Sequence, residues 1–116
     1  MPTTKVDQIK DKKLRESLAA AHGALRSGDY LDVVRRAADA YLELLRRKPE
    51  LLEEEGMMGR MRIMMFPRLG ARLERDDGQP PRVEWDRETF GFSEAVTYFE
   101  FAVDQLVREE LKIATE

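Results

Sequence analysis

The residues of this chain that could carry out chemistry are a single histidine and a few closely spaced carboxylates. His22 is the only histidine and the chain has no cysteine, so a transition-metal site would lack its usual second nitrogen or sulfur ligand. Asp39 and Glu43 are spaced one helical turn apart, as are Glu100 and Asp104. Each pair could hold a divalent ion or move protons, but this spacing is also common on solvated helix faces. We therefore predict no catalytic residue, no metal site and no cofactor, and a protein that is not an enzyme.

A segment rich in methionine and arginine is the most unusual feature of the sequence. Residues 57–66 read MMGRMRIMMF, and residues 56–75 contain five arginines against one glutamate, a local charge of +4 in a chain of net charge -3. Methionine-rich surfaces can repack around different apolar partners, and clustered arginines can contact phosphates. Because the chain is acidic, we favour arginines that pair with Glu53–Glu55, Asp76, Asp77 or an acidic partner. Nucleic-acid binding is the less favoured alternative.

The elements that must position these residues begin with a helical hairpin. A first helix is expected from about Thr4 or Asp11 to Arg26, because apolar residues recur there at three- and four-residue steps. Gly28 can close this helix in the left-handed conformation, and Asp29 can cap the next helix. The second helix carries two adjacent apolar stripes, so it should contact more than one neighbour.

The third segment should be a broken helix. It begins after Pro49, which ends the second helix, and it contains two glycines before Pro67. We expect a helix to near Met65, then a break, then a shorter helix from Pro67 to about Arg75. Residues 76–81 (DDGQPP) have the composition of a loop, and residues 82–85 alternate but are too few to predict a sheet.

The C-terminal segment has the clearest helical periodicity in the chain. Trp85 and Phe90 could form a hydrophobic staple around a helical turn capped by Asp86. Gly91 should interrupt that turn, and Ser93 should cap the long helix that follows.

Two aromatic residues lie off the main apolar stripe of this last helix. They are Tyr98 and Phe101, and Phe101 lies roughly 200° around the helix axis from Phe99 at 100° per residue. A second surface should therefore cover Phe101.

Length and composition favour one helical domain. The chain has 116 residues, of which 42% are hydrophobic and 37% charged, as in a soluble globular protein with a densely charged surface. No apolar run approaches the ~20 residues of a membrane span, and no signal peptide is recognised. The absence of cysteine fits the cytoplasm. We predict an all-α single domain over residues 1–116, a bundle of about four helices comprising the hairpin, the broken Met-rich third helix and the long C-terminal helix.

The turn Gly28-Asp29-Tyr30, with the Ala-rich helix after it, resembles the helix hairpin of tetratricopeptide repeats. A similar turn and helix occur in HEPN-type helical domains, and either resemblance covers about a third of the chain. The first implies a helical adaptor, although no second copy of the repeat follows. The second implies an RNA-associated module. Some HEPN domains are RNA-cleaving toxins with an Arg followed a few residues later by a His, and this motif is absent here because His22 precedes Arg26.

We therefore expect non-enzymatic association, either as a homodimer or with another helical protein. The apolar faces of the second and last helices are wider than one neighbour requires, and the Met-rich segment is basic within an acidic chain. The alternatives are an RNA-associated HEPN-like module without the nuclease motif and an apolar small-molecule pocket between the helices. The residues expected to face the partner are Met57, Arg60, Met61, Met64, Tyr98 and Phe101.

Overall fold

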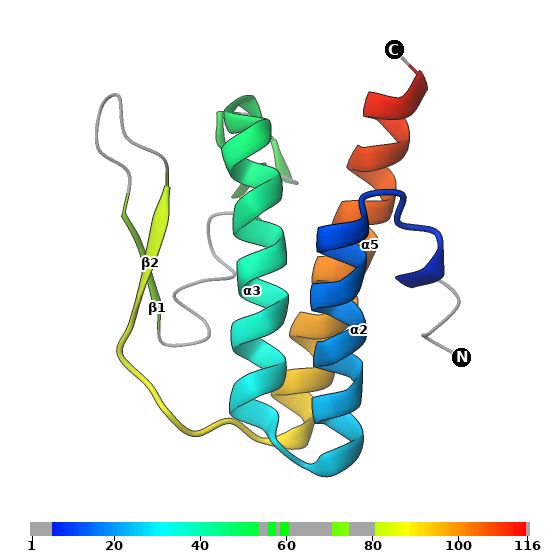
Figure 1. Ribbon diagram of the computed structural model, residues 1–116. Coiled ribbons are helices and arrows are strands. Elements are labelled where there is room, and N and C mark those ends of the chain that lie inside the picture. Colours follow the sequence, from blue (N-terminus) through cyan, green and yellow to red (C-terminus); the bar gives the residue numbers. More distant parts are fainter. Residues whose placement is uncertain (1–5, 54–55, 58, 61–70, 75–80, 116) are drawn as a thin grey trace. The chain divides into compact units, whose positions relative to one another are not determined.

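The computed structural model describes residues 6–53, 56–57, 59–60, 71–74 and 81–115, and these residues are mostly helical (Figure 1). The predicted helical character is confirmed, and a sheet of two strands is added to it. Within the described residues, no helix is both long and apolar enough to cross a membrane. In chain order the elements are α2 (Lys12–Ser27), α3 (Tyr30–Arg47), the 3-10 helix η1 (Pro49–Leu52), β1 (Ala71–Glu74), β2 (Arg82–Trp85) and α5 (Phe92–Thr115).

The chain divides into two structural units. Met1–Tyr41 and Thr89–Glu116 make up the first unit, and Leu42–Glu88 makes up the second. The first unit therefore contains α2, most of α3 and all of α5, whereas the second contains the end of α3, η1 and both strands. The single domain over residues 1–116 stays a prediction.

The start of α2 is set by Asp11, one of the two starting points that the sequence predicts. The Asp11 side chain accepts a hydrogen bond from the N–H of Leu14 at 3.0 Å. This bond satisfies one of the backbone donors that the first turn of a helix leaves free. Val6 and Asp7 form a separate short helical turn before α2, so the helix does not extend back through Lys10.

The turn between α2 and α3 has the predicted cap geometry. Gly28 has a φ of +83°, its N–H donates to the carbonyl of Leu25, and the N–H of Asp29 donates to the carbonyl of Ala24. These two bonds form the Schellman motif that ends many helices. The Asp29 side chain then accepts a hydrogen bond from the N–H of Asp32 at 3.2 Å, which caps α3 as predicted.

The broad apolar face predicted for α3 is confirmed, since residues from both stripes are buried. Arg46 and Arg47 form the basic last turn, where positive charge is favourable, and Pro49 begins η1. The buried side chains of α3 are Val33, Val34, Ala37, Ala38, Ala40, Tyr41, Leu42, Leu44 and Leu45.

The helix α5 begins two residues earlier than its predicted start. Gly91 is the capping residue: its N–H donates to the Glu94 carboxylate at 3.0 Å, and its carbonyl accepts the N–H of Ala95. Glu94 thus supplies half of a capping box, which glycine tolerates at this position. The predicted cap at Ser93 is wrong, because Ser93 lies inside the helix. The predicted helical turn after Asp86 is also wrong, because residues 86–90 are not helical.

Aromatic contacts join α5 to both other helices of the first unit. Phe99 packs against His22 of α2 with ring centroids 5.9 Å apart, and Phe101 packs against Tyr41 of α3 at 5.5 Å. Figure 1 shows that α5 runs antiparallel to α2 and parallel to α3. The helix α5 therefore has two buried sides, which explains why its apolar residues do not form one stripe.

The strands β1 and β2 form an antiparallel hairpin in the second unit. Ala71 pairs with Trp85 and Leu73 pairs with Val83, so these four side chains share one face. In the same unit the Arg46 side chain donates a hydrogen bond to the carbonyl of Pro81 at 3.3 Å, next to the start of β2.

The opposite face of the hairpin carries only charged residues. Arg72 pairs with Glu84, and Glu74 pairs with Arg82, so opposite charges face each other across the strands. The predicted short helix from Pro67 to about Arg75 is wrong over Ala71–Glu74. Four residues are too few to distinguish the two periods, and only the pairing with β2 provides the backbone hydrogen bonds that make this segment a strand.

Candidate functional site

The described part of the Met-rich segment begins at a sharp change of backbone direction. Gly56 has a φ of +98°, which a continuous helix does not allow, so the helix predicted to reach near Met65 is interrupted at this residue. Met57, Gly59 and Arg60 are helical, and the N–H of Arg60 donates to the carbonyl of Gly56 at 3.2 Å. A new helical turn therefore starts directly after Gly56.

This turn places Met57 in solvent. Its side chain is 80% exposed, and the only other large hydrophobic residue that is exposed in the described part of the chain is Phe92. Arg60 is exposed as well, and no carboxylate among the described residues forms an ion pair with it. Met61 and Met64, which were predicted to complete this surface, lie outside the described residues.

Arg72 shows how an arginine of the basic segment can be neutralised. Its guanidinium lies 3.1 Å from the Asp86 carboxylate and 3.9 Å from that of Glu74. The interpretation that these arginines pair with acidic residues of the chain therefore holds for Arg72, although the predicted carboxylates were different ones. Arg72 and Asp86 are exposed and Glu74 is half-buried, so each pair contributes at most about 1 kcal/mol to stability.

Tyr98 lies in the interior of the first unit. Its side chain is 0% exposed, and its ring stacks on that of Phe101 with centroids 6.4 Å apart. Phe101 is half-buried and meets the ring of Tyr41 edge to face at an interplanar angle of 81°. The surface expected to cover Phe101 is therefore α3 of the same chain. The prediction that Tyr98 faces a partner is wrong, because its buried ring is not accessible from outside.

The Tyr98 hydroxyl is buried without a hydrogen-bond partner among the described residues. Burial raises the pKa of Tyr98 well above its ordinary value, and the nearby Tyr41 and the negative charge of Asp39 raise it further. The phenol therefore stays protonated at neutral pH. It cannot serve there as a base or as an anionic ligand.

One carboxylate of each pair spaced one turn apart, Glu43 and Asp104, takes part in ion pairs on its own helix. Glu43 pairs with Arg47 at 3.1 Å and with Arg46 at 3.7 Å, and Asp104 pairs with Arg108 at 3.2 Å. Among the residues described, no group of three or more His, Asp and Glu is arranged to hold a metal ion. Glu43 and Asp104 thus behave as surface helix residues with basic neighbours.

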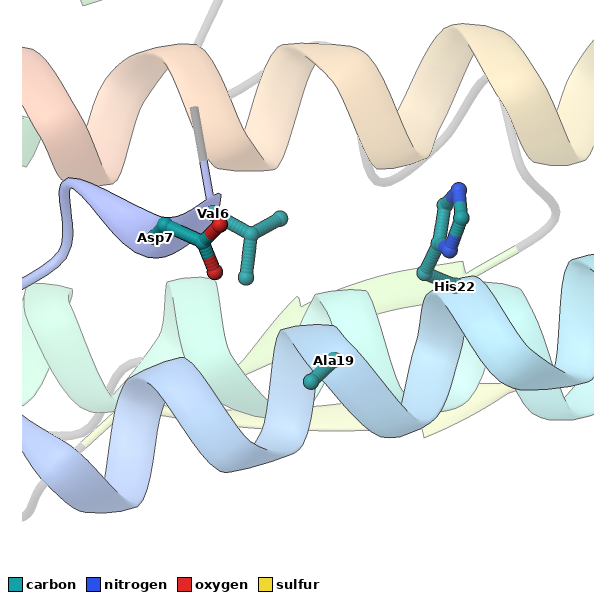
Figure 2. A pocket seen from close by; sticks show the side chains of 4 residues that line it. All are labelled: Val6, Asp7, Ala19 and His22. Carbon is teal, nitrogen blue, oxygen red and sulfur yellow. The ribbon is translucent and has the colours of Figure 1, made fainter. Parts of the chain in front are cut away.

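His22 lines a small pocket in the first unit. The pocket has a volume of about 90 Å³ and is lined by Val6, Asp7, Ala19 and His22. Figure 2 shows that the turn carrying Val6 and Asp7 lies between the ribbons of α2 and α5, and that the His22 ring points toward α5. Pockets for drug-sized ligands have volumes of roughly 300–1,000 Å³. This one has room for a few water molecules or one small side chain.

Phe92 is an exposed aromatic residue that sequence reasoning missed. It is 56% exposed, and its ring meets Tyr30 edge to face at 5.8 Å where α3 and α5 both begin. The expected cap at Ser93 placed Phe92 in a connection before the helix. The signal that identifies it is Glu94 three residues after Gly91, which makes Phe92 the first residue of α5.

Comparison of the chain with protein-family models, curated proteins and solved structures finds no match.

Proposed function

We propose that this protein acts without catalysis, as a helical module that associates with a second copy of itself. The observation that carries the proposal is the 80% exposure of Met57 at the start of the Met-rich segment, next to the exposed Arg60. Flexible thioether side chains suit contacts that repack on association, and a neighbouring arginine is typical of interface centres. An adaptor for a different helical protein would use the same residues.

The free energy gained by burying Met57 is too small to drive association alone, so Met57 must be one contact of several. Burying one methionine side chain contributes about 1.5–3 kcal/mol, whereas association costs about 4–15 kcal/mol in lost translational and rotational freedom. The proposed contact surface therefore includes Met61, Met64 and the accessible part of Phe101 in addition to Met57 and Arg60. The broken third helix of the predicted bundle, the segment that reaches Met65, is proposed to take part in this contact, and the protein is proposed to work in the cytoplasm.

The RNA-associated alternative has less support. A basic surface requires arginines that are free to contact phosphates, but Arg72 is paired with Asp86 and Glu74. Among the arginines of the basic segment that the structure describes, Arg60 alone has no ion pair. Binding to generic RNA at low salt, with affinity that falls steeply as salt rises, would favour this alternative over self-association.

Light scattering at tens of micromolar protein tests the proposal. We expect the wild-type chain to have twice the mass of one chain, and Met57→Ser to shift the mass toward that of one chain. Phe92→Ser is the matched control, because it removes the other exposed large hydrophobic side chain of the described residues and should leave the mass unchanged. A single-chain mass for the wild type, or equal losses in both variants, would contradict the proposal.

A further inference from the structure

The residues directly before α2 form a short segment that folds back onto the first unit. We call residues 6–10 the N-terminal strap. Val6 is 3% exposed and Ile9 is 0% exposed, whereas Asp7, Gln8 and Lys10 are exposed. The strap thus inserts two apolar side chains into the core and keeps its polar side chains in solvent, and a backbone hydrogen bond from Ile9 to Val6 at 3.1 Å closes its single turn.

One side chain of α2 holds the strap in place. The Arg15 guanidinium donates to the carbonyl of Ile9 at 2.9 Å and to that of Lys10 at 3.4 Å. Lys10, the last residue of the strap, and Asp11 form a non-helical connection to α2. Asp11 accepts the N–H of Leu14 and of Arg15, so the strap can move by a change of conformation at Lys10 that leaves these two bonds of α2 intact. Arg15 therefore bridges the strap to the helix across the connection.

The strap also forms one wall of the His22 pocket. Val6 and Asp7 line it from the strap, and Ala19 and His22 line it from α2 (Figure 2). Movement of the strap away from α2 would therefore open this pocket of about 90 Å³ and expose the half-buried His22 ring. The helices are held by a separate set of contacts, among them the packing of Phe99 on His22.

We propose that the N-terminal strap is a lid over the His22 pocket that opens while the three helices stay folded, and that Arg15 is its latch. Short segments outside the helices, with few buried side chains, open locally at lower free energy than a packed helical core. The two carbonyl contacts of Arg15 add to the two apolar anchors, so loss of the guanidinium should raise the open population. This inference is independent of self-association.

Arg15→Met tests the latch, because methionine keeps an apolar stem and removes the hydrogen-bond donors. Lys12→Met is the matched control: it removes a charge from an exposed side chain in the first turn of the same helix. Hydrogen exchange should accelerate about tenfold at the Ile9 amide in Arg15→Met, as expected for the loss of a charged hydrogen bond. Exchange in the middle of α3 and α5 should be unchanged.

Acylation of histidine gives a second readout, because His22 is the only histidine in the chain. Its modification by diethyl pyrocarbonate should be several-fold faster in Arg15→Met than in the wild type or in Lys12→Met. Unchanged exchange at Ile9, or unchanged His22 reactivity, would overturn the proposal. Equal acceleration of exchange in the strap, α3 and α5 would also overturn it, because the variant would then destabilise the whole unit rather than release the strap.

Discussion

The ring of Phe101 on α5 meets the ring of Tyr41 on α3 edge to face, with centroids 5.5 Å apart and an interplanar angle of 81°. This is the geometry that the quadrupoles of two aromatic rings favour. The ring of Tyr98 stacks on that of Phe101 with centroids 6.4 Å apart. The side of α5 opposite Phe99 is therefore packed by the chain itself. The cluster of Tyr41, Tyr98 and Phe101 joins α3 to α5 in addition to the contact between Tyr30 and Phe92.

Replacing Phe101 by alanine should lower the free energy of unfolding by about 2 kcal/mol. Fully buried phenylalanines cost about 3–5 kcal/mol on truncation, and Phe101 is half-buried. Phe101→Leu should cost less, because it leaves a smaller cavity. Urea unfolding followed by circular dichroism measures both values, and a stability of Phe101→Ala equal to the wild type would show that the ring does not pack on Tyr41.

Tyr98→Phe should stabilise the protein at neutral pH by up to about 1 kcal/mol. The Tyr98 hydroxyl is buried with no hydrogen-bond partner in the described part of the chain, so folding removes it from water without compensation. The ring and its contact with Phe101 are kept. The midpoint of thermal unfolding should rise, and a clear fall would indicate that the hydroxyl makes a stabilising hydrogen bond.

The raised pKa of Tyr98 should make the free energy of unfolding depend on pH in the alkaline range. Burial raises the pKa of Tyr98 in the folded state above its value in the unfolded chain, which is about 10. Above that pH the unfolded state binds fewer protons than the folded state, so the free energy of unfolding falls as pH rises. The loss should begin near pH 10. Unfolding measured from neutral to alkaline pH should show a smaller loss in Tyr98→Phe than in the wild type, and identical profiles would contradict the prediction.

Gly23 within α2 and Gly28 at its C-terminal cap should respond in opposite directions to substitution by alanine. Gly28 has a φ of +83°, where a Cβ is unfavourable, so Gly28→Ala should cost about 1–2 kcal/mol. Gly23 lies within the helix, where alanine is favoured by up to about 1 kcal/mol. A Cβ at either position would meet no atom within 4 Å, so backbone conformation alone sets the sign. Chemical unfolding of both variants provides the comparison, with Gly23→Ala as the control.

The parts of the fold that sequence reasoning predicted correctly depend on atoms a few residues apart. Asp11 caps α2 through Leu14, three residues later, and Asp29 caps α3 through Asp32 at the same spacing. The predicted start of α5 was wrong, because Ser93 and Glu94 favour different capping residues for this helix. Ser93 is the better capping residue by type, but Glu94 stabilises a start at Gly91 by accepting its N–H.

The strand β1 could not be predicted from its own four residues. Its alternating pattern indicates a strand only together with β2, which follows it in the sequence and pairs with it antiparallel. The opposite charges of Arg72 and Glu84 then match across the strands. Strand identity here is a property of the pair.

By itself, the sequence determined the helix boundaries at Gly28 and Pro49, the broad apolar face of α3 and the basic, methionine-rich character of residues 57–66, because backbone preference, periodicity and charge are local. Only the tertiary structure decided what covers each apolar side chain. It placed Tyr98 inside the first unit and left Met57 in solvent. Apolar residues of similar hydrophobicity differ in burial because burial depends on which other helix lies opposite, and that helix can be distant in sequence.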